Sequence, residues 1–168
     1  MAVLVDMITG KDLVQLVTAN IDGAIPATGL GIKAFVDLVL EKVKDRKMNA
    51  LRIWGHGITH YSDDTDYPDG NVNFGTDNLN HKNVDSLQPT LERLAACFAP
   101  AARAELRGCQ PAKGKGQEMM KRLAKIWNVE VHGSDRSQFL ITWNPPVYVA
   151  TPGGRFGTGQ GIEVFEKR

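Results

Sequence analysis

The sequence predicts a mixed α/β fold, a three-layer sandwich in which helices flank a mostly parallel central sheet. Short apolar runs of strand length alternate along the chain with amphipathic segments of helix length, an order that is typical of parallel sheets. Two of these runs end at a glycine that lies beside a histidine or a cysteine. The 168 residues are expected to form a single domain, 1–168, because a chain of this size removes roughly two-thirds of its surface from water on folding.

The first part of the chain is expected to form a strand, a helix and a second strand. Residues 2–7 are a short apolar run, whereas Lys11–Ala19 fits either a helical turn or a strand. Asn20–Thr28 has the glycine and proline that are typical of a loop. From Leu30 to Lys47 the apolar residues recur at helical spacing, which predicts an amphipathic helix. The helix is a crossover of the length that joins parallel strands, and it leads into the strand Leu51–Trp54.

The middle of the chain is less regular. Ile58–Lys82 is rich in polar residues and predicts a long loop, with a short hairpin at Asp69-Gly70 as one interpretation. Val84–Phe98 shows helical spacing, with a proline that is compatible only with the first turn, and Pro100 is expected to end this helix. The apolar run through Leu106 is the next expected strand.

The last part of the chain continues the alternation. A third helix is expected at Gln117–Trp127, with Trp127 in the core, and a short strand at Val129–His132. Further candidates are strands at Phe139–Trp143, Val147–Thr151 and Ile162–Phe165, and a loop at Gly153–Gly161.

Charge and cysteine content exclude several kinds of partner. The formal net charge of +1 provides no field that would favour nucleic acid. No apolar run approaches the roughly 20 residues of a membrane-spanning helix, so no membrane partner is expected. Cys97 and Cys109 are too few for a disulfide scaffold and fit a reducing compartment, although one disulfide between them stays open. We therefore expect a cytoplasmic protein, with export that needs no N-terminal signal as the alternative.

The sequence carries no pattern that calls for a cofactor or a metal. His56 and His60 have His-x-x-x-His spacing, but that arrangement needs a helix, which Gly57 and the polar residues after it disfavour. The glycines and lysines between Gly108 and Gly116 do not have the spacing of a phosphate-binding loop. No cofactor and no metal ion are expected.

The candidate chemistry lies at the ends of two strands. His56 stands between Gly55 and Gly57 after the run Leu51–Trp54, and 53 residues later Cys109 follows Gly108 after another apolar run. In a parallel sheet both strands end at the edge where ligands bind. A thiol needs a neighbouring base to become a strong nucleophile near neutral pH, and histidine can supply it.

The glycines at the two positions have a physical reason of their own. Gly57 and Gly108 would let the backbone turn sharply and let a substrate come close to the reactive side chains. Backbone N–H groups at these residues and at Cys109 are candidates to stabilise an oxyanion, an effect worth about 3–4 kcal/mol for each donor.

Arg107-Gly108-Cys109-Gln110-Pro111 and Gly55-His56-Gly57 together resemble the motifs of the caspase-like cysteine peptidases. The resemblance spans roughly residues 30–135 and is strongest to bacterial domains that carry Gly-His-Gly and Tyr-Gly-Cys-Asn motifs. It implies an endopeptidase in which His56 is the general base and acid and Cys109 attacks a peptide carbonyl to form a thioester. The caspase signature Gln-Ala-Cys-Arg-Gly is absent, so the resemblance leaves the substrate pocket undefined.

Ser134 and Asp135 follow the expected strand Val129–His132 and are candidates for binding substrate. By the resemblance, Asp135 would recognise a basic side chain, and an exposed acid in a turn is the alternative. Two other functions stay open at this point. One is a catalytically inactive module that binds a protein partner, and the other is a thiol-dependent hydrolase or acyltransferase acting on small molecules.

Overall fold

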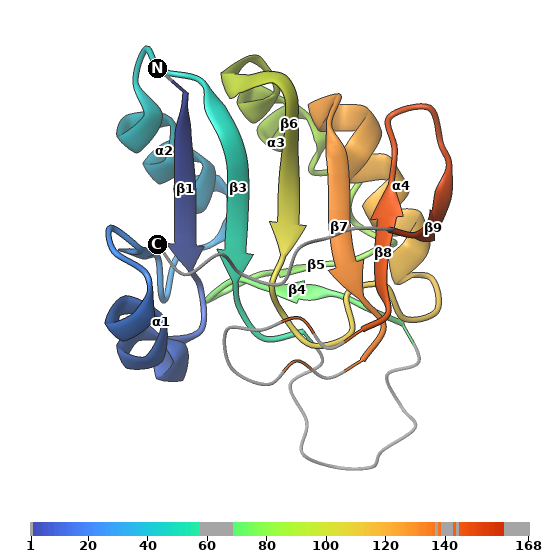
Figure 1. The fold of residues 1–168 in the computed structure, drawn as a ribbon, viewed down its shortest axis with the longest axis horizontal. Helices are drawn as coiled ribbons and strands as arrows, with labels where there is room; N and C mark the ends of the chain where they lie inside the picture. Colours follow the sequence, from blue (N-terminus) through green and yellow to red (C-terminus); the bar gives the residue numbers. More distant parts are fainter. Residues whose placement is uncertain (1, 58–68, 137, 139–142, 144, 160–168) are drawn as a thin grey trace.

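A seven-stranded, mostly parallel sheet forms the centre of the computed structural model, which describes residues 2–57, 69–136, 138, 143 and 145–159 (Figure 1). The strands are β1 (Val3–Ile8), β2 (Ile25–Pro26), β3 (Met48–Trp54), β6 (Phe98–Leu106), β7 (Glu130–Ser134), β8 (Val147–Ala150) and β9 (Phe156–Thr158). Their order in the sheet is β2-β1-β3-β6-β7-β8-β9. The first five strands in this order are parallel to one another, β8 pairs antiparallel with β7, and β9 pairs antiparallel with β8.

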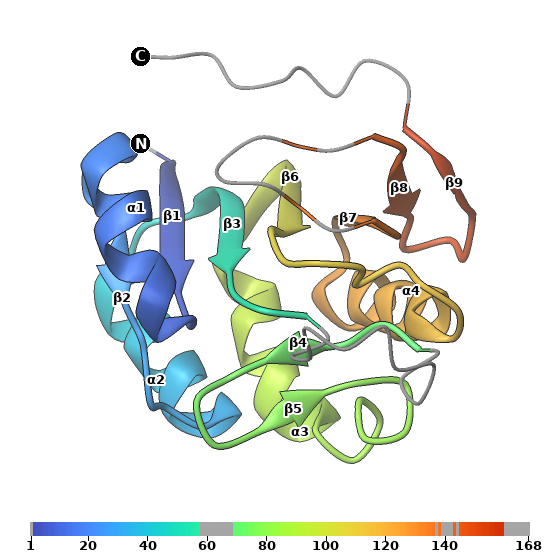
Figure 2. The ribbon, with the colours of Figure 1, turned by 90° about the horizontal axis from the view of Figure 1, so that it is seen from below.

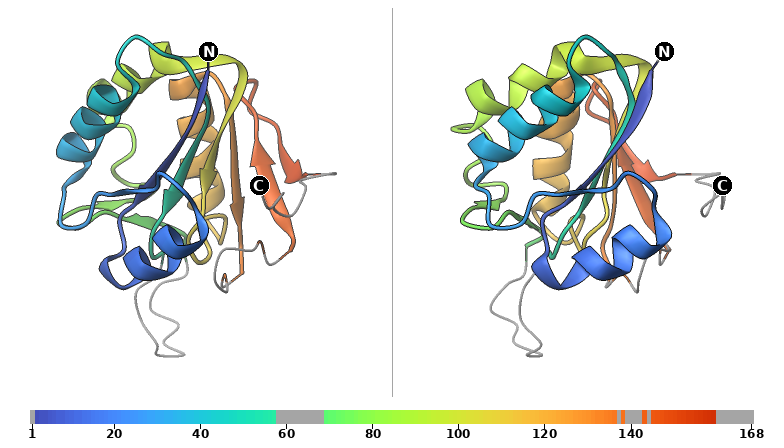
Figure 3. Two further views of the ribbon diagram at one scale, coloured as in Figure 1. Left: turned by 60° about the vertical axis from the view of Figure 1, so that its left-hand side comes forward. Right: turned by 90° about the vertical axis from the view of Figure 1, so that its left-hand side faces the viewer.

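Helices cover the two faces of the sheet unequally, as Figure 3 shows. The helices α2 (Ile32–Val43), α3 (Gln88–Leu91) and α4 (Gly116–Trp127) lie on one face, over the large hydrophobic core. On the other face, α1 (Val14–Asn20) follows a 3₁₀ turn at Lys11–Leu13 and covers only one end of the sheet. The predicted mixed α/β class with a mostly parallel sheet is therefore confirmed.

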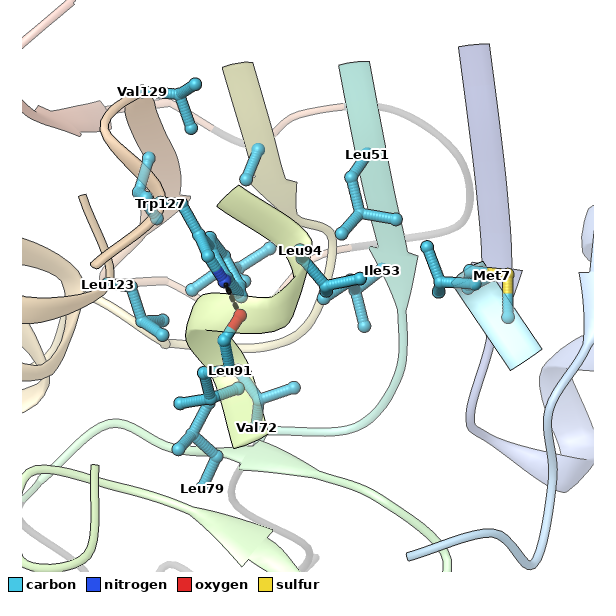
Figure 4. Close-up of a cluster of buried hydrophobic side chains, with 14 of the residues drawn as sticks. Met7, Leu51, Ile53, Val72, Leu79, Leu91, Leu94, Leu123, Trp127 and Val129 are labelled. Carbon is cyan, nitrogen blue, oxygen red and sulfur yellow. Dashed lines mark hydrogen bonds between the residues drawn. The ribbon is translucent and has the colours of Figure 1, made fainter. Parts of the chain in front are cut away.

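The main core forms where the predicted apolar stripes of α2 and α4 meet the sheet. Figure 4 shows the part of it in which Leu123 and Trp127 of α4 pack near Leu91 of α3. In α2 the buried residues recur at helical spacing, as predicted, and all of them belong to the main core. In α4 Trp127 is only 2% exposed, and its indole N–H donates to the carbonyl oxygen of Leu91 at 3.0 Å. This bond joins α4 to α3 across the core and confirms the predicted burial of Trp127.

The region Val84–Phe98 is not the single helix that we predicted. Only α3 is α-helical, the chain tightens into a 3₁₀ helix at Glu92–Cys97, and Phe98 already pairs with Met48 in the sheet. Pro100 lies within β6 at a shift in register, where a missing N–H does not interrupt the ladder. At the end of this stretch helical spacing misled the prediction because the pairing of Phe98 with Met48 of β3 overrides the local preference.

Edge strands account for two further differences. The expected loop Asn20–Thr28 contains β2, and the expected loop Gly153–Gly161 contains β9. Both strands are short and exist only through pairing with a neighbouring strand, which a single sequence does not reveal. Lys11–Ala19, for which helix and strand were both open, is helical.

The predicted hairpin after His56 is present but lies further along the chain. The strands β4 (Val72–Asn73) and β5 (Asn78–Leu79) pair antiparallel, and the turn lies between them and not at Asp69-Gly70. Residues 58–68, 139–142 and 160–168 lie outside the described residues, and with them the first part of the polar loop, most of the candidate strand Phe139–Trp143 and the candidate strand Ile162–Phe165. Trp143 itself is buried and is not part of a strand.

None of the helices in the described ranges combines the length and the apolar character that crossing a membrane requires.

Candidate functional site

The loops that carry His56 and Cys109 leave the sheet side by side. The strands β3 and β6 are parallel neighbours in which Ile53 pairs with Leu106, and both end within one residue of this pair. The N–H of Arg107 donates to the carbonyl oxygen of Ile53 at 2.8 Å and extends the ladder towards the two loops. The histidine and the cysteine therefore start from adjacent points on the carboxyl-terminal edge of the sheet.

Gly57 and Gly108 bring the two loops into direct backbone contact. A Cβ atom on Gly57 would overlap the carbonyl oxygen of Cys109, and one on Gly108 would lie 2.6 Å from the carbonyl oxygen of Gly55. Neither neighbour is a flexible side chain that could move away, so both positions require glycine. This contact fixes the separation between the loop that carries His56 and the loop that carries Cys109.

His56 has an acidic partner that was not predicted from the sequence. Its Nε2 atom lies 2.7 Å from Oδ1 of Asp12, which stands in the 3₁₀ turn directly after β1. The hydrogen bond with His56 is the main reason why the pKa of Asp12 lies below its ordinary value, and it outweighs the opposing effect of burial. Because Nε2 is engaged, Nδ1 is the ring nitrogen that remains for a thiol or a leaving group.

A second support for the histidine loop comes from β4. The backbone N–H of Asn73 donates to the carbonyl oxygen of His56, and its side-chain amide donates to that of Gly57, both at 2.9 Å. The hydroxyl of Thr9 donates in turn to the carbonyl oxygen of Asn73 at 2.8 Å. Thr9 after β1, Asn73 in β4 and the loop after β3 therefore form one hydrogen-bonded frame around His56.

Asp12 and Asn73 were missed because each was assigned to a stretch without a motif. A usable signal existed for Asp12, because a polar residue shortly after the first apolar run is the same pattern that singled out His56. For Asn73 no comparable signal exists, since its role depends on where the β4–β5 hairpin crosses the edge of the sheet.

Cys109 is half-buried, and its thiol is free, as is that of Cys97. The backbone N–H of Gln138 points at Sγ with a separation of 3.4 Å, and the carbonyl oxygen of the same residue lies 3.8 Å from Sγ. The next residue, Gln110, has a φ of 59°, and its N–H donates to the carbonyl oxygen of Arg136 at 3.1 Å. The cysteine loop is thus anchored to the segment that follows β7.

Ser134 and Asp135, the candidate substrate-binding residues, have different surroundings. Ser134 is 0% exposed, and its Oγ accepts a hydrogen bond from the N–H of Arg136 at 3.1 Å, so it has no surface with which to contact a substrate. Asp135 is half-buried, and Oδ2 accepts a hydrogen bond from the hydroxyl of Tyr148 at 3.2 Å. Its Oδ1 is buried and makes no hydrogen bond within the described part of the chain.

Beneath the two loops, the sheet face opposite the large core carries a layer of paired charges. Glu105 in β6 is 1% exposed and accepts hydrogen bonds from Arg103 and Arg107 at 2.6 and 2.7 Å. In the neighbouring strands, Asp6 accepts two hydrogen bonds of 2.6 Å from the guanidinium group of Arg52. Charges buried to this degree are tolerated only when they are paired and hydrogen-bonded, as these are.

Aromatic rings connect this charged layer to the two loops. Trp54 lies two residues before His56 and donates its indole N–H to Asp6 at 2.7 Å. Arg107 lies two residues before Cys109, and its guanidinium group is 5.4 Å from the ring centre of Trp54 and 3.9 Å from that of Trp143. Arg107 thus packs beneath both reactive loops and links the ends of β3 and β6.

Comparison with known protein families yields one match. A family model described as a domain of unknown function (DUF4347) matches residues 31–138, which include His56, Cys109 and Asp135 but not Asp12. No curated protein and no solved structure matches the chain significantly.

Proposed function

The chain belongs to the family described as a domain of unknown function (DUF4347), and we propose that it is a caspase-like cysteine endopeptidase in which Cys109 is the nucleophile and His56 the general base and acid. The observation that carries this proposal is the backbone contact between the Gly57 and Cys109 loops. It holds an imidazole and a thiol at neighbouring strand ends, on the edge where parallel sheets bind ligands. The mostly parallel sheet with helices on both faces is compatible with the caspase-like architecture, which is part of the proposal.

In the proposed reaction, Nδ1 of His56 takes the proton of the Cys109 thiol, and the sulfur attacks the carbonyl carbon of the scissile peptide bond. The tetrahedral intermediate collapses to a thioester when His56 returns the proton to the departing amine. Water then attacks the thioester while His56 accepts its proton, and the acid product leaves as the thiol is restored. Asp12 acts as a positioning residue that holds the imidazole through Nε2.

The negative charge on the tetrahedral oxygen needs N–H donors, and the two loops offer them. Within the part of the chain that the structure describes, the N–H groups of Gly57, Gly108 and Cys109 donate no backbone hydrogen bond. These groups are candidates for the oxyanion site, where each donor contributes about 3–4 kcal/mol to transition-state stabilisation. For Asp135, the proposed role is to bind a basic side chain of the substrate through its half-buried carboxylate.

The proposal is tested by thiol labelling combined with cleavage of a peptide library. Near pH 7 an electrophilic probe is expected to label Cys109 faster than Cys97, because the loop of Cys109 contacts the loop of His56. His56→Ala should slow labelling of Cys109 and leave that of Cys97 unchanged, and Cys109→Ala should abolish peptide cleavage. Equal labelling of both thiols without an effect of His56→Ala would overturn the proposal, and labelling without cleavage of any peptide would favour a small-molecule substrate.

The role of Asp12 is tested by Asp12→Asn, which keeps the shape of the side chain and removes its charge. We expect kcat to fall by about 10²-fold, at the lower end of the range for groups that assist proton transfer, because Asp12 is exposed. Asp22→Asn, at another exposed acid, is the control, and an equal kcat for the two variants would contradict the positioning role.

A further inference from the structure

A cavity of about 530 Å³ lies beside His56 at the carboxyl-terminal edge of the sheet. Residues 9–11 after β1 line one side of it, and the β4–β5 hairpin, which runs across this edge in Figure 2, lines the other. The lining residues are Thr9, Gly10, Lys11, Gly29, His56, Asn73, Phe74, Gly75, Thr76, Asp77 and Asn78.

The strand order places this cavity on one particular side of the reactive pair. In the sheet, β3 lies between β1 and β6, so the loop after β1 and the loop that carries Cys109 lie on opposite sides of His56. The lining of the cavity comes from the β1 side, from His56 itself and from the hairpin. The cavity therefore begins at the imidazole and extends away from the thiol.

The order of bond changes decides which part of a peptide would lie there. Sulfur keeps the acyl part of the substrate as a thioester, whereas the imidazole must reach the nitrogen of the departing amine to protonate it. The departing amine therefore lies at Nδ1 of His56, and the segment that continues from it runs past the imidazole, away from Cys109. A volume of about 530 Å³ leaves room for a short stretch of that segment.

The charges of the lining indicate which chemistry the departing segment carries. Asp77 is already engaged, because its Oδ2 accepts a hydrogen bond from the N–H of Ile32 at 2.7 Å, at the N-terminus of α2. Lys11 is exposed at the rim and makes no ion pair within the described residues. Asp12, its neighbour, is bound to His56. Lys11 is the lining cation that is available to a ligand.

We propose that this cavity is the subsite for the residues that follow the scissile bond, and that Lys11 selects a carboxylate there. The inference rests on the proposed peptidase function. The carboxylate belongs either to an acidic side chain within the departing segment or to the C-terminus of a short departing peptide. Both sources present the same group to the ammonium of Lys11.

The experiment keeps the acyl side of a cleavable peptide constant and varies the departing side. One series compares Asp and Glu with Asn and Gln after the scissile bond, and a second compares a free C-terminal carboxylate with its amide. Lys11→Gln should lower kcat/KM for the carboxylate substrates by about fivefold, as expected for an exposed ion pair, and leave the neutral substrates unchanged. The series that responds identifies the source of the carboxylate. Lys33→Gln, at an exposed lysine of α2, is the control.

An electrophilic probe without a departing peptide separates failure of this inference from failure of the proposed function. Cys109 should react with such a probe at the same rate in the wild type and in Lys11→Gln, because the probe does not enter the cavity. Suppose that Cys109 is labelled and peptides are cleaved, but Lys11→Gln changes neither the preference for an acidic side chain nor that for a free C-terminus. This result would overturn the subsite alone. Absence of Cys109 labelling and of cleavage in the wild type would overturn the peptidase function, and the subsite with it.

Discussion

Gly57→Ala is expected to reduce peptide cleavage by at least about 10²-fold, the cost of displacing reacting groups by roughly 1 Å. The added Cβ atom would overlap the carbonyl oxygen of Cys109 and would lie 2.8 Å from its carbonyl carbon. Since both are backbone atoms, the clash is relieved only when the two loops move apart. The imidazole and the thiol would then separate, although neither residue has been changed.

The measurement compares kcat/KM and the rate of Cys109 labelling with the thermal unfolding midpoint. Gly157→Ala in β9 is the matched control, because a Cβ atom there meets no atom within 4 Å. The control should keep the activity of the wild type. Full activity and normal labelling in Gly57→Ala would show that the contact between the loops does not organise the site.

Glu105→Gln is expected to lower the free energy of unfolding by about 3 kcal/mol, the cost of leaving a buried partner without its counter-charge. Burial lowers the pKa of Arg107 to about 10 in spite of the nearby Glu105, which shows how strongly the site disfavours an unpaired guanidinium. Burial also acts to raise the pKa of Glu105, but Arg107 and Arg103 outweigh it, and the pKa stays below its ordinary value.

The pH dependence follows from the sign of that shift. Because the pKa of Glu105 is lower in the folded than in the unfolded chain, the unfolded chain binds the proton more readily in acid. The stability that Glu105 contributes is therefore present above about pH 4.5 and is lost as the pH falls below it. The free energy of unfolding, measured with urea, should differ less between pH 7 and pH 4 in Glu105→Gln than in the wild type.

Two further variants keep this prediction testable if Glu105→Gln folds poorly. Arg103→Gln removes a partner of Glu105 that is 51% exposed, and it should cost less than about 1 kcal/mol. The double variant Glu105→Leu/Arg107→Met removes both buried charges and should recover part of the loss, because apolar replacements of a buried ion pair are often tolerated. If Glu105→Gln lowers the free energy of unfolding no more than Arg103→Gln does, the buried pair of Glu105 and Arg107 does not stabilise the fold as expected.

The charged layer shows why part of the fold escaped prediction. Arg52 stands in a run that is otherwise apolar, and a single sequence does not reveal that it meets Asp6, 46 residues away, on one face of the sheet. The same holds for β2 and β9, which are strands only because a neighbour pairs with them. In each case the partner is distant in sequence or depends on register, so local patterning carries no signal.

The sequence by itself determined the α/β class, the helices α2 and α4, and the position of His56 and Cys109 directly after strands. These features follow from the spacing of apolar residues and from glycine at the strand ends, which are local properties. The tertiary structure alone decided that Gly57 touches Cys109, that His56 pairs with Asp12, 44 residues away, and that a cavity opens on the far side of the imidazole. The physical reason is register, because the pairing of β1, β3 and β6 sets which loops end together at the edge of the sheet.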